Sequence, residues 1–258
     1  MKLYMNNKFA QEQFIEPAGR IIDYDSYGNA IYRVEVNGIE IGYKLIGRGE
    51  PLVLILGLAE TVDTWPFELI ETLMEKYLLI MPDNRGMGYT TANEEPFTFK
   101  MFADDIIGLL DALNVKKSHV LGFSMGSFIA QTLLFEYPDR LDKVILHATL
   151  TDCRESPMVQ EGKLPNNPAV RRQFEIGSQW KTPMDRLPHV TNQVMLLVGT
   201  ADNIVGLEGS KAIASAIPGA WLVQFKNGTH ELIHEAPREF GRIVLTFLDG
   251  NEVIEEKI

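Results

Sequence analysis

Apolar and polar positions follow two different periods along this chain, and the change between them predicts the order of its elements. Residues 32–36 and 39–45 alternate between apolar and polar, as a half-buried strand does, and Asn37-Gly38 between them is a typical hairpin turn. Short continuous apolar runs then replace the alternation, which predicts strands buried on both faces. These runs lie at residues 52–56, 78–81, 119–123, 143–147 and 194–199, and a further strand is predicted at 221–225 around Trp221, Val223 and Phe225.

Helical spacing of apolar residues appears between these runs. Residues 99–113 carry an apolar stripe at helical spacing, residues 128–134 continue as an apolar helix, and Pro237 opens a last helix with Phe240 and Val244 turned inward. We interpret the stripes as core and not as binding sites. The alternation of strand and helix predicts an α/β fold with a mostly parallel sheet covered by helices.

The chain is organised as one domain with an insertion, because no repeat, low-complexity segment or linker divides it. Residues 1–28 are polar and predict an irregular N-terminal lead-in. Residues 29–150 and 189–258 form the predicted core. Residues 151–188 interrupt the alternation of strands and helices. They are rich in Pro, Asn and charged residues, contain one short helical stretch at 168–179, and predict a cap over one face of the sheet.

Composition narrows the classes of partner. A formal net charge of -11 over 258 residues argues against a nucleic-acid or anionic-membrane partner and leaves small neutral or cationic substrates open. Cys153 is the single cysteine, which excludes an internal disulfide. No apolar run reaches transmembrane length, and the first residues lack the apolar region of a signal peptide, so we expect no membrane insertion and a cytoplasmic location. The sequence does not indicate the oligomeric state.

The segment Gly122-Phe123-Ser124-Met125-Gly126 is a G-x-S-x-G pentapeptide between a strand-like and a helix-like run. A serine at such a turn presents its hydroxyl out of a sharp bend, and a side chain in place of either glycine would collide with neighbouring backbone. Ser124 is therefore the candidate nucleophile.

A serine hydroxyl is a poor nucleophile at neutral pH, so Ser124 needs a base, and the base needs an acceptor that orients it. His230 and Asp202 each follow a predicted strand, and catalytic groups collect on loops at the carboxyl ends of parallel strands. We predict His230 as the base and Asp202 as its acceptor; the alternative for Asp202 is a turn or helix-capping role. Structural roles are expected for the histidines that lie in or near strands: His119, His147 and His189.

Four landmarks stand in an order that resembles the α/β-hydrolase family over about residues 30–248. They are the pentapeptide, the D-x-R-G-x-G turn Asp83-Asn84-Arg85-Gly86-Met87-Gly88, the region Leu56-Gly57-Leu58 followed by Trp65, and the H-x-x-x-x-E-x-P segment from His230 to Pro237. The order nucleophile, acid, base is also the one described for that family. The resemblance implies the α/β-hydrolase fold with a short cap insertion, and makes Asp83 and Arg85 residues that order a loop.

The resemblance also implies an oxyanion hole made of backbone N–H groups. One belongs to Met125, which follows the nucleophile, and the other to Leu58. The chain departs from the family pattern at Leu56, where histidine is usual, and at Ser127, where a third glycine is common. Neither change removes a backbone amide.

A rival motif overlaps the predicted base, because His230-Glu231-Leu232-Ile233-His234 also matches the zinc-binding H-E-x-x-H pattern. Both histidines would have to lie on one helix. The turn at Asn227-Gly228 and the position of Pro237 are incompatible with such a helix, which leaves His234 a structural role. With no phosphate loop and no cluster of Cys and His, we expect no metal and no cofactor.

The sequence thus predicts a serine hydrolase, similar to carboxylesterases and lipases, that cleaves a small carboxylic ester or related acyl compound through an acyl-enzyme. The same fold also hosts C–C hydrolases, thioesterases, lactonases and cofactor-free perhydrolases, and a non-catalytic ligand-binding protein is the remaining alternative. Dehalogenation is disfavoured, because resembling dehalogenases carry a carboxylate at the nucleophile position. We expect a comparatively open or simply lidded pocket, to which Met158, Phe174, Ile176 and Trp180 are candidates to contribute apolar surface, although packing against the core is expected for each.

Overall fold

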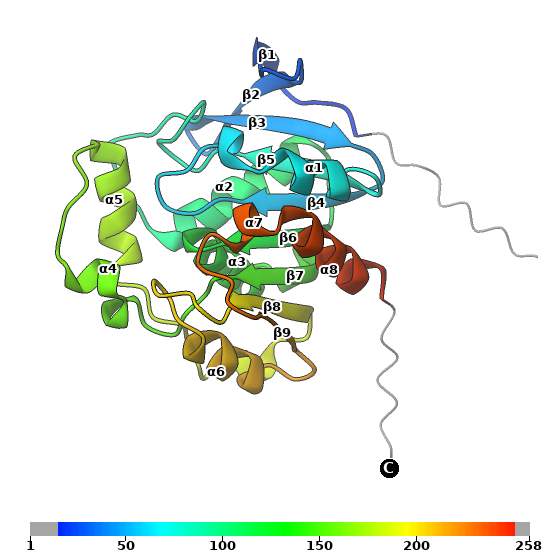
Figure 1. Ribbon diagram of the computed structural model, residues 1–258. Helices are drawn as coiled ribbons and strands as arrows, with labels where there is room; N and C mark the ends of the chain where they lie inside the picture. Colours follow the sequence, from blue (N-terminus) through cyan, green and yellow to red (C-terminus); the bar gives the residue numbers. More distant parts are fainter. Residues whose placement is uncertain (1–14, 251–258) are drawn as a thin grey trace, which may run out of the picture.

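The computed structural model describes residues 15–250, which fold around one nine-stranded sheet (Figure 1). The strands are β1 (Arg20–Tyr24), β2 (Ala30–Val36), β3 (Ile39–Gly47), β4 (Glu50–Ile55), β5 (Tyr77–Pro82), β6 (Ser118–Phe123), β7 (Leu141–His147), β8 (Gln193–Gly199) and β9 (Trp221–Phe225). The helices are α1 (Phe67–Leu73), α2 (Phe99–Ala112), α3 (Met125–Glu136), α4 (Pro157–Gln160), α5 (Pro168–Gly177), α6 (Glu208–Ala216), α7 (Leu232–Glu235) and α8 (Pro237–Asp249). Short 3₁₀ turns lie at Val62–Thr64, Pro138–Arg140, Cys153–Glu155 and Leu187–His189.

The sheet has a parallel part and an antiparallel part, in the order β1-β2-β3-β5-β4-β6-β7-β8-β9. The strands from β4 to β9 pair in parallel, while β3 joins β5 antiparallel and continues into β2 and β1. The hairpin between β2 and β3 turns at Asn37 and Gly38, both with positive φ, which is the backbone that an Asn-Gly turn supplies. The α/β-hydrolase fold predicted from the sequence is confirmed.

The irregular lead-in predicted for residues 1–28 is wrong where it falls on described residues, because Arg20–Tyr24 form strand β1. This strand is largely exposed, so its side chains do not show the alternation by which a half-buried strand is recognised. Backbone pairing with β2 holds it in place. Residues 1–14 of the predicted lead-in lie outside the described residues.

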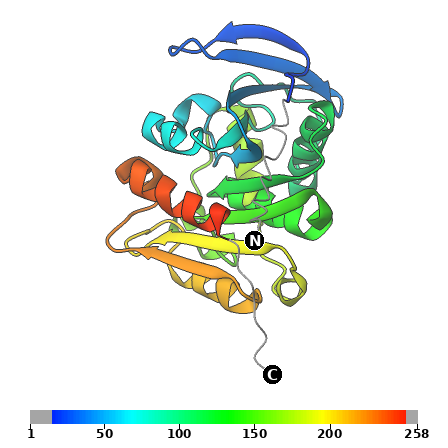
Figure 2. The same ribbon diagram turned by 90° about the vertical axis from the view of Figure 1, so that its right-hand side faces the viewer.

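Helices cover both faces of the sheet and enclose two apolar cores (Figure 2). Helices α2, α3 and α6 pack on one face, and α1 and α8 pack on the other. Every residue of β5 and of β6 is buried, in keeping with the continuous apolar runs that predicted them. Within residues 15–250, no helix is both long and apolar enough to cross a membrane.

The carboxyl ends of β4 and β6 lie side by side, because these strands are neighbours although β5 separates them in sequence. After β4 the chain continues to α1 on one face of the sheet, and after β6 it continues to α3 on the opposite face. The loops after these two strands therefore diverge and leave room for a ligand between them. Helices α4 and α5, from the predicted cap, lie at this end of the sheet (Figure 1).

Candidate active site

Ser124 lies in a strained turn between β6 and α3, with φ 52° and ψ -119°. Its two flanking glycines permit the turn. A Cβ on Gly122 would lie 2.3 Å from the carbonyl oxygen of Gly126, and a Cβ on Gly126 would lie 2.2 Å from that of Ile55. The predicted collision at both glycines is confirmed, and it explains how α3 can pack so closely on β4 and β6.

The side chains of Ser124, His230 and Asp202 form one continuous chain of hydrogen bonds. His230 Nε2 lies 3.0 Å from Ser124 Oγ, and His230 Nδ1 lies 3.0 Å from Asp202 Oδ2. With the Nδ1–H tautomer, His230 donates to the carboxylate and accepts from the serine hydroxyl. The three residues come from the loops after β6, β8 and β9, so the structure brings together the side chains that the sequence singled out.

Asp202 is held as a buried carboxylate. Burial alone would raise its pKa, but the hydrogen bond from His230 and those from the backbone N–H groups of Val205 and Ile204 bring the pKa below its ordinary value. Both amides donate to Asp202 Oδ1, at 3.0 Å from Val205 and 2.9 Å from Ile204. The carboxylate is therefore ionised and fixed in orientation, as the acceptor of a catalytic histidine must be.

The loop after β4 passes directly against the serine. A Cβ built on Gly57 would lie 2.7 Å from a carboxylate oxygen of Glu60 and 3.2 Å from Ser124 Cβ, so a side chain here would crowd both residues. The next N–H group, that of Leu58, donates to no protein acceptor within the described residues, and Met125 begins helix α3 beside the serine. The predicted oxyanion donors thus lie on the two backbone segments that flank Ser124, where the positive end of the α3 dipole adds to their effect.

A narrow apolar pocket of about 40 Å³ lies between the cap and Ser124. Of the four cap residues considered from the sequence, Met158 and Phe174 line this pocket. Ile176 and Trp180 instead pack against the core, where Trp180 stacks on Phe128 at 5.2 Å between ring centroids.

Comparison with known proteins identifies the superfamily. The meta-cleavage product hydrolase CumD from Pseudomonas fluorescens IP01 superposes with a TM-score of 0.77 at 21% identity, covering 84% of this chain and 97% of CumD. A family profile described as alpha/beta hydrolase fold matches residues 50–176, and one described as TAP-like protein matches residues 152–252. The chain belongs to the α/β-hydrolase superfamily.

Two curated relatives show how far the similarity of this α/β hydrolase extends. BpoC from Mycobacterium tuberculosis, named as a non-heme bromoperoxidase, is 37% identical over 112 residues, or 43% of this chain and 42% of BpoC. RutD from Caulobacter, named as a carbamate hydrolase, is 24% identical over 246 residues, or 78% of this chain and 91% of RutD. The chain therefore matches less than half of the length of BpoC, and most of RutD at lower identity.

Two residues of the site escaped the sequence analysis, and Gln173 is one of them. This fully buried side chain of α5 accepts a hydrogen bond from Ala59 N at 3.2 Å and donates one to the Arg85 carbonyl oxygen at 3.3 Å. It ties the cap to the loop that carries Leu58. Gln173 lies on the buried face of α5 with Val170 and Phe174, where an apolar residue is usual, and this exception could have marked it as a site residue.

Glu60 is the second residue that was missed. Its carboxylate accepts the Gly57 N–H at 2.7 Å, and this contact closes the loop beside Ser124. Burial, opposed by the Gly57 hydrogen bond and aided by the nearby Glu231 charge, raises the pKa of Glu60 to about 7. Glu60 is the one charged residue in the short segment between Leu56 and Val62, and this position could have marked it as a candidate site residue.

The Glu60→Gln variant should change how stability depends on pH. Because the folded pKa of about 7 lies above the ordinary value of 4.5, Glu60 favours the folded state fully below pH 4.5, and this contribution is lost as the pH rises through 7. Glutamine resembles the protonated acid, so the variant should be more stable than the parent at pH 8 by about 2 kcal/mol and similar to it at pH 4. Thermal unfolding across this pH range measures the difference.

The matched control for this prediction is Glu94→Gln, at an exposed glutamate. It should shift the unfolding temperature equally little at every pH. Parallel stability curves for the parent and Glu60→Gln would show that Glu60 does not titrate as its burial predicts.

The remaining residues considered from the sequence lie outside the hydrogen-bonded chain. Asp83 accepts hydrogen bonds from Val62 N at 2.6 Å and Tyr89 N at 2.7 Å, and Arg85 pairs with Asp105 at 2.6 Å, in agreement with loop-ordering roles. His147 is fully buried, which lowers its pKa to about 4. His119 contacts Glu50 from within β6, and His189 is exposed.

The zinc-binding alternative does not fit the backbone. His230 precedes α7, which begins at Leu232 and ends at Glu235, and Pro237 starts a separate helix. Both ring nitrogens of His230 are engaged by Asp202 and Ser124. Within residues 15–250, no group of three or more metal-ligating side chains is close enough to hold a metal ion.

Proposed function

We propose that this protein is a serine hydrolase that cleaves a small carboxylic ester or a related acyl compound through an acyl-enzyme. The observation that carries the proposal is the hydrogen-bonded chain from Ser124 through His230 to Asp202 at a strained strand-to-helix turn. This arrangement activates a hydroxyl for attack on a carbonyl carbon.

The steps follow from the positions of the groups. Ser124 Oγ attacks the carbonyl carbon while His230 Nε2 takes the hydroxyl proton, and Asp202 stabilises the imidazolium that forms. The carbonyl oxygen becomes negative and is held by the N–H groups of Leu58 and Met125. His230 then returns the proton to the leaving alkoxide, the alcohol departs, and water attacks the acyl-enzyme by the same sequence.

Covalent labelling tests the proposal directly. A fluorophosphonate should react with Ser124 alone, and mass spectrometry of the digested protein should locate the adduct on the peptide that contains it. The labelled protein should lose the ability to hydrolyse p-nitrophenyl acetate. Folded protein that remains unlabelled at millimolar reagent would overturn the proposal.

The narrow pocket predicts a preference for short acyl groups. A cavity of about 40 Å³ holds only a few non-hydrogen atoms, well below the space that a drug-sized ligand occupies. We expect kcat/KM for p-nitrophenyl acetate to exceed that for the octanoate by at least about tenfold. Phe174→Ala, which removes a ring from the pocket wall, should reduce this ratio by raising the rate on the octanoate.

Ile176→Ala is the matched control, since Ile176 lies on the same helix but packs against the core. It should leave the ratio of the two rates unchanged. A parent enzyme that prefers octanoate would show that the cap opens in solution or that the acyl group binds elsewhere.

A second candidate is perhydrolysis, which the name of BpoC as a non-heme bromoperoxidase and the small pocket favour together. Here hydrogen peroxide replaces water as the attacking molecule on the acyl-enzyme, and the products are a peroxy acid and free Ser124. The peroxy acid then oxidises bromide in solution, returning the carboxylic acid. Bromination of monochlorodimedone in acetate, hydrogen peroxide and bromide tests it; no bromination above the Ser124→Ala background would exclude this reaction.

A further inference from the structure

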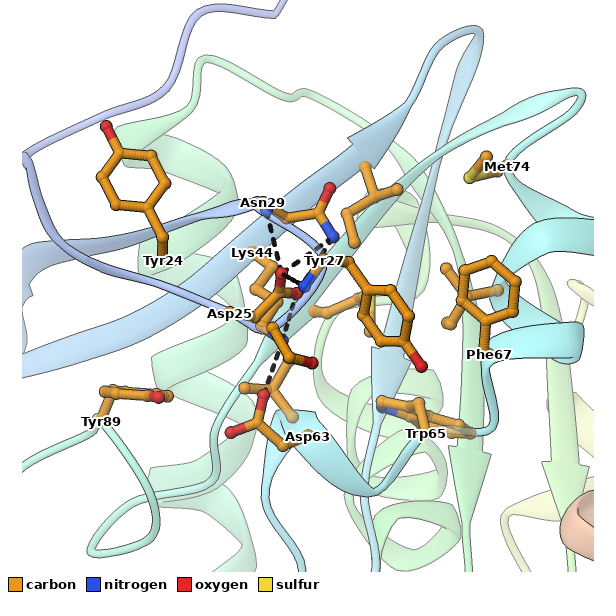
Figure 3. A pocket seen from close by; sticks show the side chains of 15 residues that line it. Tyr24, Asp25, Tyr27, Asn29, Lys44, Asp63, Trp65, Phe67, Met74 and Tyr89 are labelled. Carbon is orange, nitrogen blue, oxygen red and sulfur yellow. Dashed lines mark hydrogen bonds and ion pairs between the residues drawn. The ribbon is translucent and has the colours of Figure 1, made fainter.

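A second cavity, larger than the pocket beside Ser124, lies away from that residue. Its volume is about 590 Å³, and it lies between the turn that joins β1 to β2 and the segment from Val62 to Met74 that includes α1 (Figure 3). It shares no lining residue with the pocket beside Ser124. A ligand of ordinary metabolite size would fit in it without touching the proposed catalytic groups.

Aromatic side chains form the walls of this cavity. Tyr27 and Phe67 stack with their ring centroids 4.9 Å apart, and Tyr24 and Tyr89 also line it. Of the seven large hydrophobic side chains that are exposed in residues 15–250, four surround this hollow: Tyr24, Tyr27, Phe67 and Met74. Tyr27 is 68% exposed, so its ring lies beside the cavity in contact with water and does not contribute to the apolar core. Exposed apolar groups gathered around a hollow mark a binding site.

The charges in the cavity leave an excess of one negative charge. Lys44 Nζ lies 2.8 Å from Asp25 and 2.6 Å from Asp63 (Figure 3). Burial alone would raise the pKa of Asp25, but hydrogen bonds from Lys44 and Asn29 lower it to about 2, and contacts with both carboxylates raise the pKa of Lys44. Lys44 is thus paired with both carboxylates, and the Asp63 side chain stays 50% exposed. An anionic ligand would meet no free positive charge here.

One polar group in the wall lacks a partner. Trp65 is only 6% exposed, and its Nε1 is buried without a hydrogen-bond acceptor within the described residues. The nitrogen-bearing edge of the ring lies on the side of Asp63 in Figure 3. A buried N–H donor without an acceptor costs free energy, but this one exposes too little surface for a ligand in the cavity to reach it, so the Trp65 ring is a wall of the cavity and its N–H a reporter of binding.

We propose that this cavity binds a small organic ammonium compound. The faces of Tyr27 and the neighbouring rings attract a cation, and Asp63 adds its exposed carboxylate. Binding is independent of the acyl chemistry at Ser124, since the two sites share no residue.

A pair of matched probes separates charge from shape. (2-Methoxyethyl)trimethylammonium carries the cation, and 3,3-dimethylbutyl methyl ether is its neutral carbon analogue; neither contains an ester or other acyl bond that Ser124 could attack. The cation should bind at least about tenfold more tightly than the neutral ether in calorimetry. It should also shift the Trp65 indole N–H resonance, because the ring lines the cavity, and Trp65→Phe assigns that resonance.

Two surface variants keep the test valid if Trp65→Phe fails to fold. Asp63→Asn and Tyr27→Leu should each reduce the preference for the cation by about threefold or more, while Asp185→Asn, at an exposed aspartate elsewhere, should not. Equal affinity for both probes, or no change in the Trp65 resonance, would overturn the proposal. So would Trp65 and Tyr27 resonances that move with protein concentration alone, because this face would then be a contact between two copies of the chain.

Discussion

Ser124→Ala should lower kcat/KM for p-nitrophenyl acetate by about 10⁴-fold or more, the largest loss expected from any single substitution in this protein. The variant lacks the oxygen that forms the acyl-enzyme, while Leu58 and Met125 retain their N–H groups. Alanine meets the same strain as serine at φ 52°, so the unfolding temperature should change by only a few degrees. Steady-state kinetics and calorimetry on the same preparation separate the two effects.

Ser178→Ala is the matched control, because Ser178 lines the same pocket but its hydroxyl donates to the Glu175 carbonyl at 2.9 Å. It should keep kcat/KM within about threefold of the parent, as expected for a substitution that leaves the reacting groups in place. It should also keep the fluorophosphonate reaction. Comparable activity in the two variants would mean that the nucleophile is not Ser124.

Asp202→Asn is expected to have the second largest effect, a fall in kcat of about 10⁴-fold. An amide at this position turns its NH₂ group toward His230 Nδ1, which favours the tautomer with the proton on Nε2. His230 then has no lone pair to accept the proton of Ser124. The amide oxygen still accepts from Val205 and Ile204, so the loop should keep its shape.

The same variant makes a prediction about acid stability. Because the folded pKa of Asp202 is below the ordinary value of 3.8, its carboxylate stabilises the fold above pH 3.8 and this contribution is lost as the pH falls through the folded pKa. Asp202→Asn should therefore be less stable than the parent at pH 7, and the difference should shrink toward pH 2. A gap that stays constant from pH 7 to pH 2, or an active Asp202→Asn enzyme, would contradict the role given to this residue.

The parts of the fold that the sequence predicts are those in which a local pattern has a single structural solution. Continuous apolar runs predicted the parallel strands to within two residues at each end, because strands covered on both faces have no polar side. The turn at Ser124 was predictable because both glycines are required by close backbone contacts. Loops at the carboxyl ends of β8 and β9 placed Asp202 and His230 near it.

The parts that escaped prediction depend on contacts between distant segments. Strand β1 is exposed and is held by pairing with β2, so no periodicity marks it. Gln173 meets Ala59 across 114 positions of sequence, and Glu60 gains its unusual environment only when the loop closes on Ser124. The cavity around Lys44 likewise forms from segments that lie apart in the chain.

The contact of Gln173 with Ala59 and Arg85 has a consequence for engineering. Caps are attractive units to exchange between related enzymes in order to change substrate range. In this protein the cap also supplies the acceptor for the loop that carries Leu58, so a graft that omits Gln173 would alter turnover as well as selectivity. A chimera should therefore carry over the α5 glutamine together with the loop from Gly57 to Glu60, treating the two as a single cassette.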